Sequence, residues 1–190
     1  MKKYIFTALF AAILMTAGIS SSASAKEMRW PETGVPYLTF AVPAHWVAKP
    51  DYKDMSINLM PEKMTKDTLQ VVTIGYETYK PLDLTSKNFE AIMTNILGGI
   101  NSSDKVQAKP FYQRHRNMIS GITWDRFSTS LSMPSSGVKT ATRIFVCAGP
   151  SSLMALSFSS ALPRFSADMH KILGSVRAYG IKSCPLNDAK

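Results

Sequence analysis

Seven segments of the chain have the alternating or β-branched-rich hydrophobic pattern that is typical of β-strands. They span residues 37–42, 55–59, 69–79, 106–113, 119–131, 138–147 and 153–159. Turn-forming stretches such as Pro134-Ser135-Ser136-Gly137 separate the later segments. Because short connections join consecutive strands, the pattern predicts antiparallel pairing.

Two further segments repeat hydrophobic residues at steps of three and four, which is typical of amphipathic helices. The first begins at Thr85, whose hydroxyl can cap it, and ends at Gly98-Gly99. The second spans residues 163–176. The predicted order is three strands, a helix, four strands and a helix. We therefore expect an α+β fold, with an antiparallel sheet flanked by helices.

The first 25 residues have the pattern of a secretory signal peptide. Lys2 and Lys3 precede an apolar stretch over residues 4–19, and small residues follow up to Ala25. An uncleaved membrane anchor is the alternative, but the apolar stretch is shorter than the ~20 residues that span a bilayer. We expect residues 1–25 to be removed. Residues 26–190 would then form a single domain in the periplasm, with no transmembrane segment.

Charge is distributed unevenly along this expected domain. The whole chain has a formal net charge of +9, and loss of Lys2 and Lys3 leaves 20 basic against 13 acidic residues. Residues 26–100 contain 8 basic and 9 acidic residues, whereas residues 101–190 contain 12 and 4. Such an excess favours an acidic protein or an anionic envelope component as partner, and export argues against nucleic acid. A solvated basic face without a partner is the alternative.

The two cysteines of the chain are predicted to form a disulfide. Cys147 ends a predicted strand, and Cys184 lies in the C-terminal tail. Exported proteins meet an oxidising environment, and the pair lacks the Cys-x-x-Cys spacing of redox-active thiols. We expect a structural bridge that ties the tail to the sheet.

Two short segments resemble the fold family of the photosystem subunit PsbP and the Ran-binding Mog proteins. Phe40-x-Val42-Pro43-x-x-Trp46 is similar to the opening strand of that family, and residues 169–176 are similar to its last helix. The resemblance implies an α/β/α sandwich and a binding or accessory role. The family has no shared catalytic set that could be transferred to this chain.

The sequence contains no recognisable catalytic, metal or cofactor motif. His45, His115 and His170 lack the spacing of metal ligands, and neither a nucleophile elbow nor a phosphate-binding glycine loop is present. We therefore expect no metal and no cofactor. The alternative is a small periplasmic hydrolase whose site is assembled by the fold, which a cleft with a buried carboxylate beside His45 or His170 would favour.

The strongest candidate binding group combines basic and aromatic residues on two predicted strands joined by residues 114–117. Its members are Lys109, Phe111, Tyr112, Arg114, Arg116 and Arg126. A hairpin would bring them together, and arginine can hold carboxylate or phosphate through two hydrogen bonds. The alternative is that these arginines only keep an exposed hairpin soluble. The expected function is that of a non-enzymatic binding or accessory protein, such as an inhibitor or immunity factor for an envelope-directed enzyme.

Overall fold

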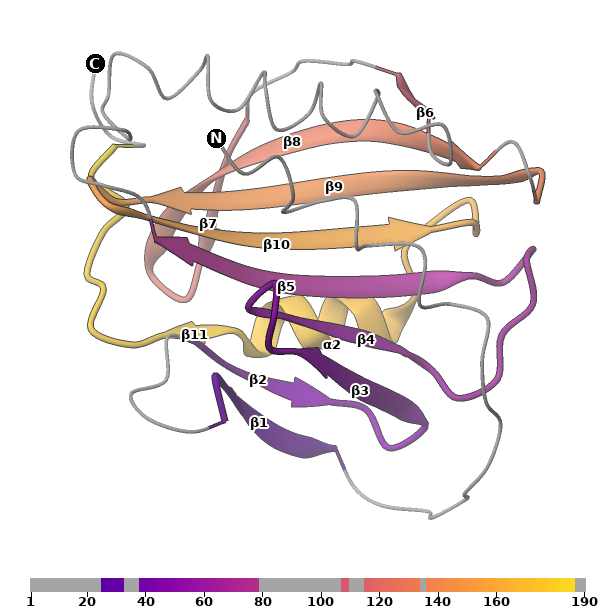
Figure 1. Ribbon diagram of the computed structural model, residues 1–190, viewed down its shortest axis with the longest axis horizontal. Coiled ribbons are helices and arrows are strands. Elements are labelled where there is room, and N and C mark those ends of the chain that lie inside the picture. The colour runs from indigo at the N-terminus through magenta and orange to yellow at the C-terminus, as the bar shows by residue number, and fades with distance from the viewer. Residues whose placement is uncertain (1–24, 33–37, 79–106, 110–114, 134–135, 187–190) are drawn as a thin grey trace.

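The computed structural model describes residues 25–32, 38–78, 107–109, 115–133 and 136–186 (Figure 1). In chain order its elements are β1 (Lys26–Trp30), β2 (Leu38–Val42), β3 (Trp46–Asp51), β4 (Ser56–Pro61), β5 (Gln70–Thr78), β6 (Gln107–Lys109), β7 (His115–Ile119), β8 (Ile122–Met133), β9 (Val138–Ala148), β10 (Ser152–Ser160), α2 (Ala167–Ser175) and β11 (Arg177–Ala178).

The strands form two antiparallel sheets. The small sheet has the order β1-β2-β11, so its central strand joins segments from both ends of the described chain. The large sheet has eight strands, with β3-β4-β5-β10-β9-β8-β6 in order and β7 also paired with β8. Both β7 and β6 pair with β8, β7 along residues 122–126 and β6 along residues 130–132. The long strands β5, β8, β9 and β10 form the middle of the sheet.

The expected α/β/α sandwich is wrong, because the protein is mostly β. The described residues contain two sheets and one helix, α2. The early strands were expected in a single sheet, but β2 pairs with β1 and β11 instead of β3. The small sheet therefore helps to cover a face that was expected to be covered by helices alone. The helix predicted to begin at Thr85 lies outside the described residues, as does the predicted signal segment up to residue 24.

The predicted C-terminal helix is confirmed, although it is shorter than expected. Ser166 caps α2, since its hydroxyl accepts a hydrogen bond from the Met169 amide at 3.3 Å. Met169 and Ile172 are buried on one side of the helix. At the other end, the Arg177 guanidinium donates to the Gly174 carbonyl at 2.9 Å, which places a cation at the negative end of the helix dipole.

The main core lies between α2, the small sheet and one face of the large sheet. We call this the inner face, and it carries Ile74, Phe145 and Leu156. Phe145 and Phe158 meet edge to face at 5.8 Å between ring centroids, which is a favourable geometry for aromatic pairs. The opposite, outer face also carries buried side chains, and its polar groups pair with one another. The Thr73 hydroxyl, for example, donates to the Asn58 side chain at 2.6 Å.

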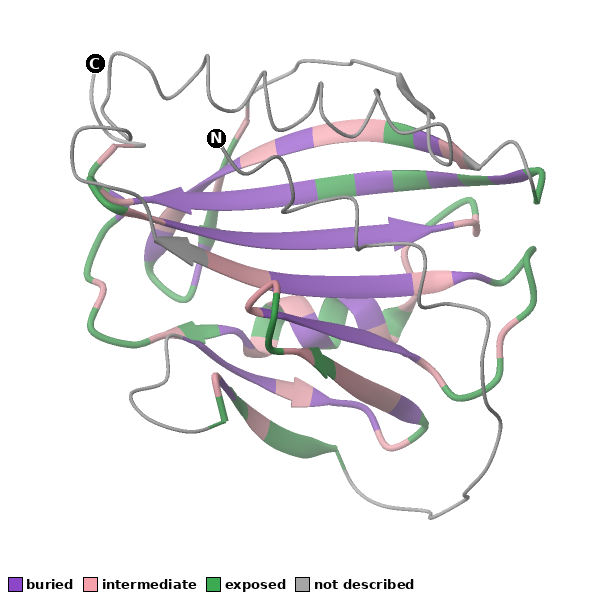
Figure 2. Ribbon diagram, viewed as in Figure 1, coloured by how far each residue is buried: buried purple, intermediate pink, exposed green. Residues whose placement is uncertain are grey.

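The core does not cover the whole inner face. Along the first half of β9, the outer-face residues Val138, Thr140 and Thr142 are buried, whereas residues 139, 141 and 143 on the inner face are exposed. Figure 2 shows this alternation as bands along β9. From Ile144 onwards every residue of β9 is buried. The inner face thus passes from core to solvent within one strand.

Candidate binding surface

The hairpin expected around residues 114–117 is displaced in the structure. Residues His115–Ile119 form β7, and the turn lies at Ser120-Gly121 instead. Both turn residues have positive φ, 52° and 81°, as a two-residue hairpin turn requires, and glycine supplies one of them without steric cost. The two strands it joins are therefore β7 and β8.

The six predicted binding residues are only partly placed by the structure. Phe111, Tyr112 and Arg114 lie outside the described residues. Lys109 lies in β6, directly opposite Ser130 of β8.

Arg116 and Arg126 are both placed, but they lie on opposite faces of the sheet. Arg116 is opposite Asp125, a fully buried outer-face residue, while Arg126 is opposite Phe145 on the inner face. Since side chains alternate along a strand, these two arginines point away from each other.

The structure places Arg126 on the same sheet face as two cations that sequence reasoning missed. The solvent-facing part of the inner face consists of Arg126, Ser128, Ser130, Ser132, Lys139, Ala141 and Arg143, which we call the basic strip. Its register places Ser128 opposite Arg143 and Ser132 opposite Lys139. Arg126 and Arg143 are therefore diagonal neighbours, about 7–8 Å apart. Neither β8 nor β9 contributes an acidic residue to this face.

Local contacts orient the two arginines of the basic strip differently. The Arg143 guanidinium carbon lies 4.6 Å from the centroid of the Phe165 ring, a cation–π contact that holds it beside the start of α2. Arg126 is half-buried, and among the described residues its Nε, like the indole Nε1 of neighbouring Trp124, is a buried donor with no hydrogen-bond partner.

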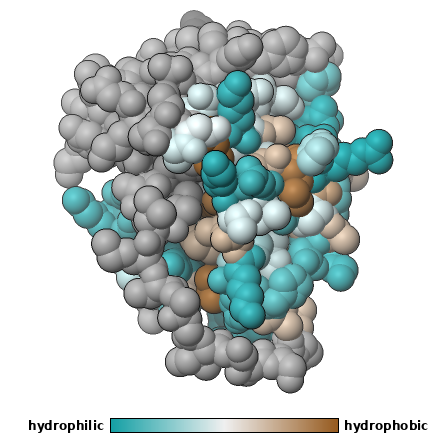
Figure 3. All heavy atoms as spheres, turned by 90° about the vertical axis from the view of Figure 1, so that its right-hand side faces the viewer, coloured by the Kyte–Doolittle hydropathy of each residue, from teal (hydrophilic) through white to brown (hydrophobic). Residues whose placement is uncertain are grey.

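A cleft lies at the end of the basic strip. It has a volume of about 240 Å³ and is lined by Lys66, Asp67, Ser136, Gly137, Val138, Lys139 and Ala161. Lys139 belongs to both the strip and the cleft. Figure 3 shows this end of the molecule, where hydrophilic side chains surround small apolar patches. The cleft is thus polar and shares Lys139 with the strip.

The predicted disulfide between Cys147 and Cys184 is confirmed. Both residues are buried, their Cα atoms are 5.1 Å apart, and the bond spans 37 positions of sequence. The Leu186 amide donates to the Ala148 carbonyl at 3.1 Å beside it. The bond and this contact fix the tail to β9, and a buried structural disulfide is typical of exported proteins.

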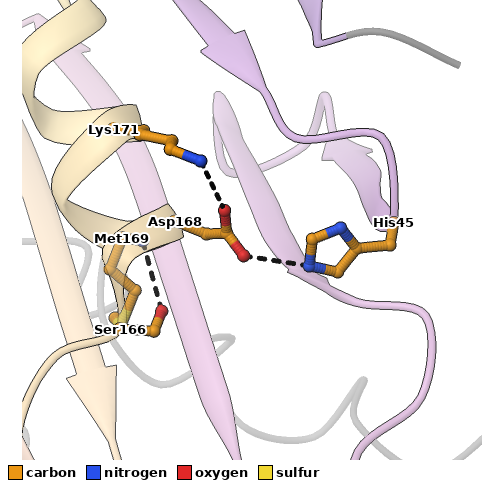
Figure 4. Close-up of polar contacts among 5 residues, drawn as sticks. All are labelled: His45, Ser166, Asp168, Met169 and Lys171. Carbon is orange, nitrogen blue, oxygen red and sulfur yellow. Dashed lines mark hydrogen bonds and ion pairs between the residues drawn. The ribbon is translucent and has the colours of Figure 1, made fainter.

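His45 and Asp168 form the contact that would be relevant to a hydrolase. The His45 Nε2 lies 2.9 Å from the Asp168 carboxylate, and the Lys171 ammonium lies 3.6 Å from its other oxygen (Figure 4). The side chains of His45 and Asp168 are 64% and 22% exposed. The hydroxyl of Ser166 bonds to the Met169 amide rather than to His45. This is a surface contact between the turn before β3 and the first turn of α2, and it differs from the buried site that a hydrolase was expected to need.

Other chemistry is not indicated in the described part of the chain. Within residues 25–32, 38–78, 107–109, 115–133 and 136–186, no three or more His, Cys, Asp or Glu residues gather as metal ligands would. The helix found there is too short to cross a membrane.

The described fold defines the protein as a mostly β protein with two antiparallel sheets and a helix against them. No protein-family model and no curated protein matches its sequence. The PsbP/Mog-like resemblance therefore stays a prediction.

Two of the solved structures to which the chain is similar come from Mycobacterium tuberculosis and Bacteroides thetaiotaomicron VPI-5482. One is the crystal structure of LpqN, which is involved in cell envelope biogenesis of Mycobacterium tuberculosis. Its TM-score is 0.51 at 11% identity, and the match covers 80% of this chain and 89% of LpqN. The other comes from Bacteroides thetaiotaomicron VPI-5482, with a TM-score of 0.46 at 10% identity. That match covers 75% of this chain but 45% of the other. At such identities the likeness to LpqN concerns the fold.

Proposed function

We propose that the protein is a non-enzymatic binding or accessory protein of the periplasm, and that the basic strip holds an anionic partner. The observation that carries this proposal is the grouping of Arg126, Lys139 and Arg143 on one face of β8 and β9, where those strands contribute no opposing carboxylate. A field of one sign attracts a partner of the other sign and speeds encounter with it.

Location in the cell envelope is supported by three separate features. The first 25 residues have the pattern of a secretory signal. The Cys147–Cys184 disulfide is of the kind that persists outside the cytoplasm. The fold is similar to that of LpqN, itself involved in cell envelope biogenesis. An inhibitor or immunity factor for an envelope-directed enzyme is one form that such a binding protein would take.

Retention on immobilised envelope extract at rising salt tests the proposal. The variant Lys139→Glu/Arg143→Glu reverses two exposed cations of the basic strip, and Lys53→Glu/Lys182→Glu makes the same charge change at exposed positions outside it. We expect the first variant to elute at lower salt than the wild type and the second to elute nearly with it. If both variants lost retention equally, the effect would come from net charge alone, and the proposal would be overturned.

A small hydrolase is the second candidate function, and the 2.9 Å contact between His45 and Asp168 is the observation that favours it. Its exposure favours a structural role instead, because general acid–base groups act best where water is excluded. Wild type and His45→Ala can be compared on ester, amide and glycoside substrates. Hydrolysis by the wild type that is lost in His45→Ala would establish the hydrolase.

A further inference from the structure

The basic strip and the cleft beside it form one continuous path across the end of the large sheet. From Arg126 to Ser132, β8 extends about 20 Å at roughly 3.4 Å per residue. Lys139 lies opposite Ser132 and also lines the cleft, where Lys66 adds another cation and Asp67 a single carboxylate. On this basis, and resting on the proposed function, we propose that the path binds a linear anionic polysaccharide.

The shape of the inner face argues for a linear chain over a membrane surface. Helix α2 packs on the same face, because Met169 and Ile172 share the core with Phe145 and Leu156. A helix is about 10–12 Å in diameter with its side chains, so α2 rises well above the strip. In Figure 1, α2 lies at the level of β4, whereas β8 and β9 lie higher, toward the opposite edge of the large sheet. A flat bilayer would meet α2 first, whereas a flexible polymer can lie along the strip beside it.

The composition of the strip argues for a polysaccharide over a protein. Protein interfaces depend on aromatic or other large apolar anchors at their centre. Between its cations the strip carries only Ser128, Ser130, Ser132 and Ala141. The large exposed hydrophobic residues among those described, Tyr52, Met118 and Tyr179, lie elsewhere. Serine hydroxyls both donate and accept hydrogen bonds, as sugar hydroxyls do, and so match them in either direction.

The two ends of the path would contact different parts of the polysaccharide. At one end, the half-buried guanidinium of Arg126 would donate hydrogen bonds to a carboxylate or sulfate. At the other end, the cleft has about 240 Å³, less than the ~300–1,000 Å³ of pockets that enclose a whole small molecule. The cleft therefore fits a terminal unit of the chain. Affinity should come from several weak contacts made at once, and so should depend on ligand length.

Fluorescence polarisation with heparin-derived oligosaccharides of two, four, six and eight sugars tests this inference on the full mature chain. We expect affinity to rise by about tenfold or more with length until the ligand spans the ~20 Å strip, and then to level off. Lys139→Glu/Arg143→Glu should remove the dependence of affinity on ligand length. Lys66→Ser should weaken binding of the longer ligands. The control Lys53→Glu/Lys182→Glu should keep the dependence on length. Circular dichroism confirms that each variant is folded.

Vesicles of phosphatidylglycerol and a poly-glutamate peptide serve as the competing ligands. Preference for either over the longest oligosaccharide, or affinity that does not change with oligosaccharide length, would overturn the inference. The proposed function has a separate outcome. The strip variant could still be retained less than its control on envelope extract while no oligosaccharide binds. In that case the strip binds another anionic partner, and only the polysaccharide assignment fails.

Discussion

Loss of the Cys147–Cys184 bond should cost the protein a large part of its stability. The bond closes a loop of 37 positions that contains β10, α2 and β11. In the chain-entropy model, a cross-link over that length removes about 13 cal/mol/K from the unfolded chain, or about 4 kcal/mol at 25 °C. For a domain of this size we expect the melting temperature to fall by roughly 8–16 °C.

Urea denaturation followed by circular dichroism measures this loss, using the wild type in its oxidised and reduced forms. The two forms have the same side chains, so their difference isolates the bond. The double variant Cys147→Ala/Cys184→Ala should lose at least as much, because both residues are buried and removal of their sulfur atoms also weakens packing. A difference below about 1 kcal/mol between oxidised and reduced protein would refute the entropic reasoning.

Three smaller perturbations test local contacts. Ser166→Ala should destabilise the fold by about 1 kcal/mol in chemical denaturation, since it removes the cap of α2, and no change would show that the cap is dispensable. Thr73→Val should cost about 1–3 kcal/mol by leaving the buried Asn58 oxygen without its donor, while a neutral result would contradict that pairing. The hydrogen bond to Glu32, followed by burial, raises the pKa of Tyr52. Its contribution to stability is therefore present below pH 10 and lost as pH rises through the higher folded pKa. In ultraviolet titration, Glu32→Gln should shift its ionisation to lower pH, and an unchanged curve would count against this cause.

The long strands could be predicted from sequence because one or both of their faces are buried along most of their length. Residues 69–79 and 138–147 were expected as strands, and the structure has Gln70–Thr78 and Val138–Ala148. The strand predicted over residues 55–59 was less accurate, since Met55 lies in a turn with φ 47° and β4 begins at Ser56. The local hydrophobic pattern predicts a strand where burial along it is regular, but it does not predict where the strand begins or ends.

The small sheet could not be predicted from local pattern. Only Trp30 is buried in β1, so its five residues show no alternation. Arg177 and Ala178 of β11 become a strand only because they pair with Thr39 and Leu38, which are far away in sequence. Local pattern does not reveal that long-range pairing. The predicted elements alone therefore led to a sandwich with helical layers, which is wrong.

The candidate site was partly visible in the sequence. Arg126 was identified, but Lys139 and Arg143 were not, because their grouping depends on the register between β8 and β9. The alternation of Lys139, Ala141 and Arg143 with buried residues was the available signal, since it marks a strand with one solvated face. The disulfide was predictable because the two cysteines of a chain that is expected to be exported have one another as partners.

The composition of the small sheet sets the order in which the protein can complete its fold. Strand β2 is flanked by β1, which precedes it in the chain, and by β11, which follows every other described element. Trp30, Leu38 and Phe40 share their core with Val176, so their burial is incomplete until the C-terminal segment has arrived. A chain synthesised from its N-terminus cannot complete this core before residues 176–178 emerge, because contacts so distant in sequence form late. Under the proposed export, this delay would leave the core incomplete until the C-terminal segment has crossed the membrane.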